Sequence, residues 1–293
     1  MQHALRRTAR YSCSQRALHH LTAACGHLGL VHGKGLVARG GDEKESILMA
    51  KEPAGLSGEE CLIARYFRPL ARHPGAFGLV DDAAALMPPP GCDVVLKTDG
   101  LIGGVHFFPN DPAETVGKKA LRVNLSDLAA KGARPLGFLL ALALPEETGA
   151  AWLEPFARGL GEDADFFGCP LLGGDTDKTP APINISITAL GAVEHGRMIR
   201  RSGAKVGDHV VVTGTIGDAA LGCLLRSDPT TGKRWNLDER QRGHLTGRYL
   251  LPEPRTTFTD LLRAHATAAM DVSDGLAGDL TKLCRASNVA VRD

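Results

Sequence analysis

The stretch AETVGKKALRVNLSDLAAKGARPLGFLLALAL, residues 113–144, carries the strongest fold signal in the chain. Residues 113–131 are expected to form an amphipathic helix because apolar residues recur at near-helical spacing, and Gly132 is expected to end it. The apolar positions are Val116, Ala120, Val123, Leu125 and Leu128. Residues 135–144 are short and almost continuously apolar, which is typical of a buried strand.

Working outward, the same patterns predict further strands over 93–99 and 183–189 and helices over 61–70 and 150–167. Strands that alternate with helices indicate an α/β domain, with bounds that we place at residues 58–194. Glycine-containing stretches between these elements, such as Gly173-Gly-Asp-Thr176, are interpreted as turns.

A second α/β domain is expected over residues 195–293. Residues 209–213 and 268–273 each resemble a strand that leads through a turn into a helix, over 218–225 and 276–283 respectively. The polar segment 227–242 is expected to be a mobile loop. Because residues 289–292 begin what resembles another strand, the second domain is predicted to be incomplete.

Composition limits the function classes. The chain has 293 residues, 43% of them hydrophobic, and a formal net charge of +1, which gives no overall electrostatic attraction to nucleic acid or to an anionic membrane. The longest apolar run, residues 138–144, is too short to span a bilayer. Seven cysteines without a CxxC pair suggest free thiols, so a soluble, cytoplasmic protein is expected.

Residues 1–57 differ from the rest. They carry eight Lys or Arg and four Asp or Glu, with no acidic residue before Asp42. Such a basic, acid-poor opening has the composition of an organellar transit peptide. It lacks sustained periodicity, and we interpret it as a poorly ordered basic extension.

Aspartates recur where apolar segments give way to glycine-rich or polar ones, and one more lies on the predicted helix 113–131. They are Asp81, Asp82, Asp99, Asp127, Asp175, Asp271 and Asp274. If these carboxylates converged they would repel one another unless cations neutralised them. Mg²⁺ takes oxygen ligands and keeps open positions for phosphate, so the set predicts a magnesium site for a polyphosphate. Taken singly, each aspartate is better explained by ordinary turn chemistry, and only the set favours a metal.

Familiar nucleotide and hydrolase motifs are absent from the sequence: it has no P-loop, no GxGxxG after a strand, no protein-kinase signature and no GxSxG elbow. Weaker candidates remain. Gly173-Gly-Asp-Thr176 permits close approach of phosphate, the segment 214–218 offers amides at a helix start, and Arg201 is a candidate phosphate contact. His106 follows a flexible turn and is either a substrate contact or a structural histidine.

In combination the motifs resemble one family, the thiamine-monophosphate kinases, within the ATP-using superfamily of aminoimidazole ribonucleotide synthetase. The resemblance runs from about residue 59 to the end. The motifs that carry it are, in order, residues 62–67, Asp81-Asp82, Thr98-Asp99, residues 104–107, 123–130, 173–176, 201–204, 212–218 and 271–275.

The resemblance implies a two-domain aminoimidazole ribonucleotide synthetase-like fold, a homodimer formed through the sheet of the first domain, and transfer of the γ-phosphoryl group of ATP to thiamine phosphate. It implies no general base, because the acceptor is already a phosphate oxygen. It implies several Mg²⁺ ions and leaves room for a monovalent cation. By position, the implied metal ligands are Asp82, Thr98, Asp99, Asp127, Asp175, Asp271 and Asp274. The implied ATP contacts are Gly174, Asp175, Arg201 and Ser273, and His106 is the implied contact to thiamine phosphate.

Two positions depart from the family pattern: Val80 replaces a glycine before the paired aspartates, and Lys97 stands where relatives often carry a Ser or Thr ligand. The sequence also lacks the family's last segment, which helps to hold the thiamine moiety in relatives. Two alternatives therefore stay open. One is a sister ATP-dependent synthetase of the same superfamily, and the other is a nucleotide-binding remnant without turnover.

Overall fold

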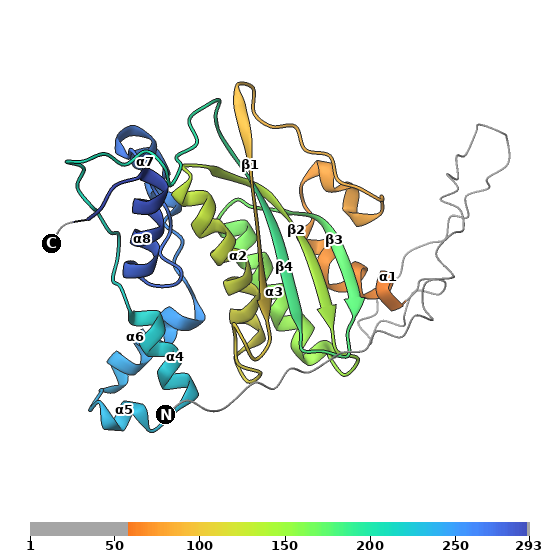
Figure 1. Cartoon of the computed structure of the whole chain (residues 1–293). Helices are drawn as coiled ribbons and strands as arrows, with labels where there is room; N and C mark the ends of the chain where they lie inside the picture. The colour runs from red at the N-terminus through yellow and green to blue at the C-terminus, as the bar shows by residue number, and fades with distance from the viewer. Residues whose placement is uncertain (1–57, 292–293) are drawn as a thin grey trace, which may run out of the picture. The chain divides into compact units, whose positions relative to one another are not determined.

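The computed structural model describes residues 58–291, so the extension expected over residues 1–57 lies outside the described residues. A four-stranded sheet has the order β1-β4-β2-β3 (Figure 1). Its strands are β1 (Cys92–Ile102), β2 (Arg134–Leu144), β3 (Leu171–Lys178) and β4 (Asn184–Glu194). Strand β4 is antiparallel to both β1 and β2, and β3 is parallel to β2.

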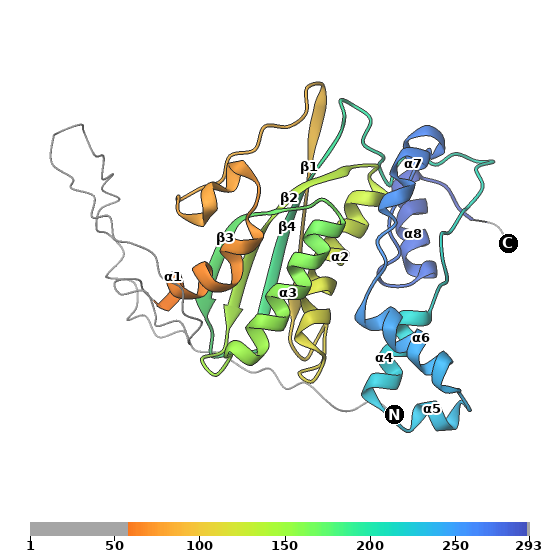
Figure 2. The ribbon, with the colours of Figure 1, turned by 180° about the vertical axis from the view of Figure 1, so that it is seen from behind.

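Two long helices cover one face of this sheet, α2 (Ala113–Ala130) and α3 (Ala150–Phe166), as Figure 2 shows. Their apolar sides bury Leu121, Leu125 and Phe156 against Phe138 of β2. Glycines bring the two helices close together. A Cβ atom built at Gly117 of α2 lies 2.4 Å from the carbonyl oxygen of Phe156, so no side chain fits there without moving α3.

The remaining elements precede and follow this layer pair. Before the sheet come α1 (Gly58–Leu62), a π-helical turn (Ile63–Phe67) and two 3₁₀ turns (Arg68–Leu70 and Pro74–Leu79). After it come α4 (Asp218–Ser227), α5 (Thr231–Arg234), α6 (Glu239–Leu250), a 3₁₀ turn (Thr256–Phe258), α7 (Thr259–His265) and α8 (Leu276–Ser287).

Most predicted elements of the first domain are confirmed; the stretch expected as one helix over 61–70 is helical, but it follows the end of α1 as a π-helical turn and a 3₁₀ turn. Helices expected over 113–131 and 150–167 and strands expected over 93–99, 135–144 and 183–189 all form, and several strands are longer than predicted. One interpretation there is wrong: Gly173-Gly-Asp-Thr176 is not a turn but lies within β3. Glycine suits this place because a Cβ on Gly174 would lie 1.8 Å from the carbonyl oxygen of Leu140 on β2.

The strands predicted in the second half are wrong. Residues 209–213 and 268–273 form no strand, and residues 289–291 likewise have no regular structure. A strand needs a hydrogen-bonding neighbour, and no strand in the part of the chain that the structure describes pairs with 209–213, where Val211 is 82% exposed. Around 268–273, Ala269 uses its backbone groups elsewhere, donating to Arg200 and accepting from Lys131.

The mobile loop predicted over 227–242 is also wrong, because α5 and the start of α6 lie there. Asp238 caps α6 by accepting a hydrogen bond from the backbone N–H of Gln241, while the Gln241 side chain accepts from the N–H of Asp238. This reciprocal capping box is a local signal in the sequence that fixes where α6 begins.

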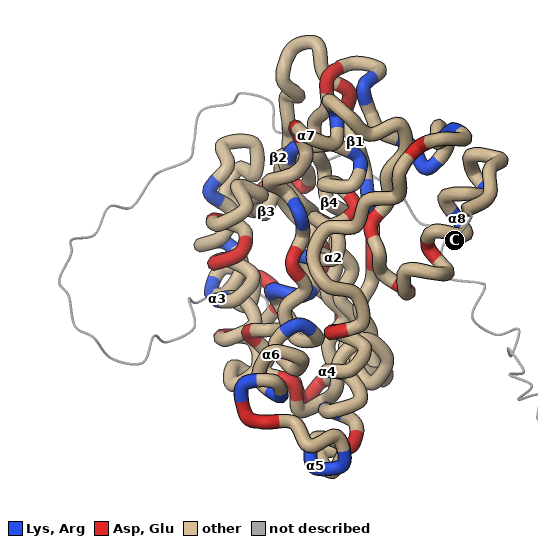
Figure 3. Tube along the Cα trace, turned by 90° about the vertical axis from the view of Figure 1, so that its left-hand side faces the viewer, with Lys and Arg blue, Asp and Glu red and all other residues tan. Residues whose placement is uncertain are grey.

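No helix between residues 58 and 291 is long and apolar enough to cross a bilayer. Acidic and basic residues are both spread over the visible chain (Figure 3), and α5 carries two basic residues, Lys233 and Arg234, and no acidic one. The five cysteines in the described range are free thiols. The domain boundaries at residues 58, 194 and 195 and the cytoplasmic location stay predictions.

A buried ion pair ties the helices α4 and α6 to the segment before α2. The Asp111 side chain is fully buried and accepts two hydrogen bonds from the Arg226 guanidinium of α4, at 2.9 and 2.6 Å. Its other oxygen accepts from Tyr249 of α6 at 3.2 Å and from the backbone N–H of Phe108 at 2.9 Å. Lys119 of α2 lies 3.7 Å from the centre of the Tyr249 ring.

We expect Arg226→Met to lower the free energy of unfolding by roughly 3 to 5 kcal/mol, because it leaves the Asp111 carboxylate buried without its cation. Urea unfolding followed by circular dichroism measures this loss. The matched control is Arg65→Met, which removes an exposed pair with Glu154 and should change stability by less than about 1 kcal/mol. Equal losses in the two variants would contradict the role given to Asp111.

Candidate active site

Charged side chains from three segments meet beside the C-terminal half of α2. Strand β1 supplies Lys97 and Asp99, which are two residues apart and therefore face the same side of the sheet, toward α2. The Lys97 Nζ lies 2.8 Å from Oδ2 of Asp127 on α2 and 3.7 Å from Oδ2 of Asp99. Burial opposes the charge on Lys97, but the hydrogen bond to Asp127 and the nearby acidic charges outweigh it and raise its pKa.

Asp271 completes this group from the segment before α8. Burial and the adjacent Asp127 carboxylate raise the pKa of Asp271 to about 6, and a hydrogen bond with the Ser126 side chain and the charge of Lys97 oppose the rise. The carboxyl groups of Asp127 and Asp271 therefore lie next to each other. We call Lys97, Asp99, Asp127 and Asp271 the Lys97 cluster.

A second lysine borders the cluster. Lys131 follows Asp127 by one helical turn, and its Nζ donates a hydrogen bond of 2.8 Å to the backbone carbonyl of Ala269. Burial and then the charge of Arg201 lower the pKa of Lys131, and the Asp127 and Asp271 charges partly offset them. Arg201 therefore lies within electrostatic reach of Lys131, which borders the cluster.

The segment that carries Asp271 is held by a buried carboxylate. Asp279 of α8 has a side chain only 1% exposed, and its Oδ2 accepts hydrogen bonds from the backbone N–H groups of Ser273 and Asp274, at 3.0 and 2.9 Å. Lys282 Nζ bridges Asp279 and Asp274, at 2.8 and 2.7 Å. Burial opposes the charge on Asp279, but the hydrogen bonds from Lys282 and these N–H groups keep its pKa low.

Two predicted ligands lie on the opposite face of the sheet. The Thr98 hydroxyl donates to the carbonyl of Ile187 at 3.2 Å, and the alternation along β1 directs it away from Asp99. Asp175 on β3 pairs in register with Ala141 on β2, which pairs with Ser186 on β4. Three strand spacings, about 14 Å, separate that position from β1.

The other predicted contacts also lie apart from the Lys97 cluster. His106 accepts a hydrogen bond at Nδ1 from the backbone N–H of Ile102, and its carbonyl accepts from Lys119, two turns of α2 and about 12 Å from Asp127. Asp82 follows a segment in which Phe77 and Leu79 have positive φ, and its N–H donates to Asp81.

The structure therefore brings Asp99, Asp127 and Asp271 together, with Arg201 nearby, and leaves Asp82, Thr98, Asp175 and His106 at other places. Gly174 lies in β3, while Ser273 and Asp274 lie in the segment held by Asp279. Within residues 58–291 no three His, Cys, Asp or Glu side chains form a ready-made metal site. The ligand and contact roles of these residues stay predictions.

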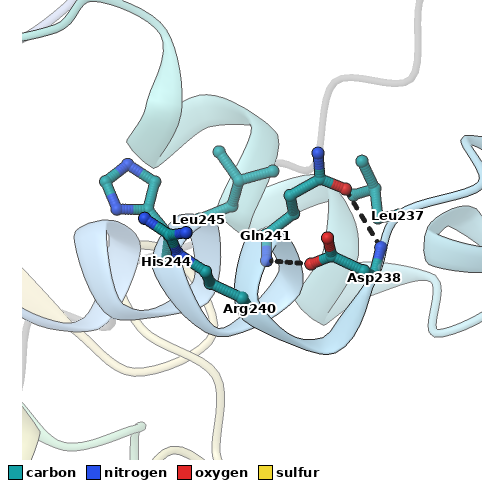
Figure 4. Close-up of a pocket in the computed structure, with 6 residues that line it drawn as sticks. All are labelled: Leu237, Asp238, Arg240, Gln241, His244 and Leu245. Atoms are coloured by element: carbon teal, nitrogen blue, oxygen red, sulfur yellow. Dashed lines mark hydrogen bonds between the residues drawn. The ribbon is translucent and has the colours of Figure 1, made fainter.

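An open pocket of about 540 Å³ lies at the start of α6 (Figure 4). The residues that line it are Leu237, Asp238, Arg240, Gln241, His244 and Leu245. His244 on its wall is 2.8 Å from Asp218 of α4, and Asp238 and Gln241 are engaged in the capping box. A second shallow pocket is lined by residues 145–147 and 178–182. Neither pocket includes a predicted site residue.

The donor set of the Lys97 cluster fits a divalent cation. It offers carboxylate oxygens, the ligand type that Mg²⁺ prefers: those of Asp127 and Asp99 lie 2.8 and 3.7 Å from the Lys97 ammonium, and the charge of Asp271 acts on the same ammonium. The raised pKa of Asp271 means that the site gains from additional positive charge.

Comparison with known proteins agrees with this architecture. Models of the N-terminal and C-terminal domains of AIR synthase related proteins match residues 80–193 and 205–292. The class is therefore that of the two-domain AIR synthase related proteins, as the sequence predicted.

Among individual relatives, the thiamine-monophosphate kinase of Caulobacter vibrioides is 46% identical over 231 residues, which cover 78% of this chain and 63% of the relative. That of Escherichia coli K12 is 41% identical over 238 residues, covering 80% and 71%. The structure of AaThiL complexed with AMPPCP and TMP aligns with a TM-score of 0.62 at 34% identity, covering 73% of this chain and 71% of that one. The chain belongs to the thiamine-monophosphate kinase family, and it spans 63% to 71% of the length of these relatives.

The sequence analysis missed three residues of the site: Lys131, Asp279 and Ser126. Lys131 could have been found from its spacing of four residues after Asp127 on the same helix face. Asp279 could have been considered as an acidic residue in the first turns of a predicted helix. The hydrogen bond between Ser126 and Asp271 had no signal, because it joins segments 145 positions apart.

We expect Asp279→Ala to lower the free energy of unfolding by roughly 3 kcal/mol, because the Ser273 and Asp274 N–H groups and Lys282 lose their shared acceptor. Urea unfolding measures the loss, and hydrogen exchange measures faster opening at Ser273 and Asp274. Asp279→Asn keeps one acceptor oxygen and should fall between Asp279→Ala and the parent. Unchanged exchange in Asp279→Ala would show that this carboxylate does not hold the segment.

Proposed function

We propose that the chain is a thiamine-phosphate kinase that transfers the γ-phosphoryl group of ATP in line to thiamine phosphate, with several Mg²⁺ ions, and makes thiamine diphosphate. The observation that carries the proposal is the convergence of Asp99, Asp127 and Asp271 around one cation position, beside Arg201. Family membership supports the choice of reaction, and AaThiL was solved with AMPPCP, an analogue of ATP, and TMP.

In this proposal Asp99, Asp127 and Asp271 hold Mg²⁺, which when bound neutralises phosphate oxygens during phosphoryl transfer. Arg201 binds a phosphate group by charge-assisted hydrogen bonds, and Lys131 adds positive charge behind it. Asp279 keeps Asp271, Ser273 and Asp274 in one rigid segment. The remaining predicted ligands, Asp82, Thr98, Asp175 and Asp274, and the contacts of Gly174 and His106 keep their proposed roles.

No side chain is needed as a general base. The acceptor is a phosphate oxygen that is already ionised at neutral pH, so the requirements are alignment and compensation of negative charge. Lys131 supplies positive charge beside Asp127, and Arg201 supplies it beside Lys131. This charge lowers the repulsion between two anionic substrates.

A homodimer through the open face of the sheet is part of the proposal. The face that α2 and α3 leave uncovered carries exposed Val94, Leu96, Ile102 and Leu139, and Leu96 is 69% exposed. Apolar side chains grouped on one sheet face favour contact with another apolar surface. A second copy of the same face supplies one, because a two-fold interface is self-complementary.

The proposed activity predicts ATP-dependent formation of thiamine diphosphate from thiamine phosphate, measured by a coupled ATPase assay with chromatography of the product. Asp127→Asn removes the carboxylate that Lys97 and Asp271 share, and we expect kcat/KM to fall on the order of 100-fold with the fold intact by circular dichroism. The control Asp165→Asn changes an exposed aspartate of α3 and should keep the parent rate.

Each alternative has its own outcome in this assay. Binding of Mg·ATP without any thiamine diphosphate would contradict turnover and favour the nucleotide-binding remnant. ATP consumption with an aminoimidazole precursor in place of thiamine phosphate would favour the sister synthetase. Parent rates in Asp127→Asn would refute the assignment of the metal site.

The dimer predicts that Leu96→Asp shifts the sedimentation coefficient from that of a dimer to that of a monomer, because it places a charge in the apolar interface. Analytical ultracentrifugation at micromolar concentration measures the change. Met87→Asp is the control, since Met87 is 89% exposed but lies in the segment before β1, and it should stay dimeric. A monomeric parent protein would refute the proposed interface.

A further inference from the structure

The Lys97 ammonium occupies the point on which the acidic groups of the cluster converge. Its Nζ is 2.8 Å from Asp127 and 3.7 Å from Asp99, and the Asp271 charge also acts on it. The Lys97 side chain is 30% exposed and that of Asp127 only 17%, so water screens their attraction incompletely. This lysine is therefore the counter-ion of the cluster.

The neighbouring cations do not take this place. Lys131 directs its ammonium to the backbone carbonyl of Ala269, 2.8 Å away. The carboxyl groups of Asp127 and Asp271 are adjacent, and a cation in contact with Asp127 reduces the repulsion between them. Of the basic residues that the structure describes near the cluster, Lys97 makes that contact.

A divalent cation would bind the same carboxylate oxygens, those of Asp99 and Asp127. Mg²⁺ binds carboxylate oxygens at about 2.0 to 2.1 Å, and an ammonium that donates hydrogen bonds to the same oxygens repels it. The lysine side chain has a flexible four-carbon stem, which allows the ammonium to leave the carboxylates without moving β1.

We propose that Lys97 competes with divalent cations for the carboxylates of Asp99 and Asp127, so that free metal binds this chain weakly and enters chiefly together with a phosphate ligand. The link to a phosphate ligand rests on the proposed function. The competition itself rests only on the position of Lys97. Displacement moves the ammonium from the carboxylates to solvent or to the incoming phosphate. Hydrogen bonds are exchanged, and no covalent bond is made or broken.

Mn²⁺ titration of the nucleotide-free protein, followed by electron paramagnetic resonance of the unbound ion, tests the competition. Lys97→Met should lower the Mn²⁺ dissociation constant by about 10-fold or more, because the competing charge is gone. Lys97→Arg keeps a cation and should bind Mn²⁺ as weakly as the parent. Lys178→Met is the matched control, since Lys178 is an 84% exposed lysine whose nearest acidic partner lies 4.0 Å away, and it should change nothing.

A second measurement uses the parent protein and holds even if Lys97→Met folds poorly. Mn²⁺ should increase the labelling of Lys97 by an amine-reactive reagent, quantified by mass spectrometry against Lys178, because the metal displaces the ammonium from its partners. Unchanged or reduced labelling of Lys97, or equal Mn²⁺ affinity in a folded Lys97→Met protein, would overturn the proposal. Neither measurement uses ATP or thiamine phosphate, so failure of the proposed kinase activity would leave this result unaffected, and the reverse also holds.

Discussion

The burial of α2 against the sheet is the constraint on which the site depends. Leu121, Leu125 and Leu128 are almost completely removed from solvent, and this apolar stripe fixes how the helix is rotated about its axis. With that rotation fixed, Asp127 faces β1 and Lys131 reaches the segment before α8. A helix with a weaker stripe would not hold charges from three distant segments within hydrogen-bonding distance.

The electrostatics of the site follow from this placement. Carboxylates that are partly withdrawn from water must be compensated locally, and the chain does so with lysines on β1 and α2. The same sheet separates functions by face: even and odd positions of β1 point to opposite sides, so Asp99 joins the charged group while Thr98 and Leu96 face the open side. One strand thus contributes both to the proposed chemistry and to the proposed subunit contact.

Much of the first domain was predictable because its signals are local. The apolar periodicity of residues 113–131 and the alternation of residues 183–189 each specify an element without reference to the rest of the chain. Residues 209–213 were wrongly predicted as a strand because an apolar run indicates only a preference, whereas a strand also requires a neighbour. The sequence 173–176 was misjudged because glycine suits both a turn and a close contact between strands.

The candidate site was predicted in part for a similar reason. The aspartates at 99, 127 and 271 could be selected by residue type and by family resemblance, and they do meet. The face on which Asp175 lies depends on the register between β2 and β3, which no short stretch of sequence specifies. The contact of Lys97 with Asp127 likewise joins positions 30 residues apart and becomes visible only when β1 and α2 are packed together.

The close crossing of α2 and α3 at Gly117 also constrains how this chain can vary. A single methyl group there is electrically neutral and lies more than two helical turns from Asp127, yet it would have to displace one helix from the other. Because α2 carries Asp127 and is followed directly by Lys131, a displacement of the helix would also move these two charged side chains. A packing substitution at this glycine would therefore be detected as an altered affinity for cations, and a survey of variants limited to charged positions would overlook it.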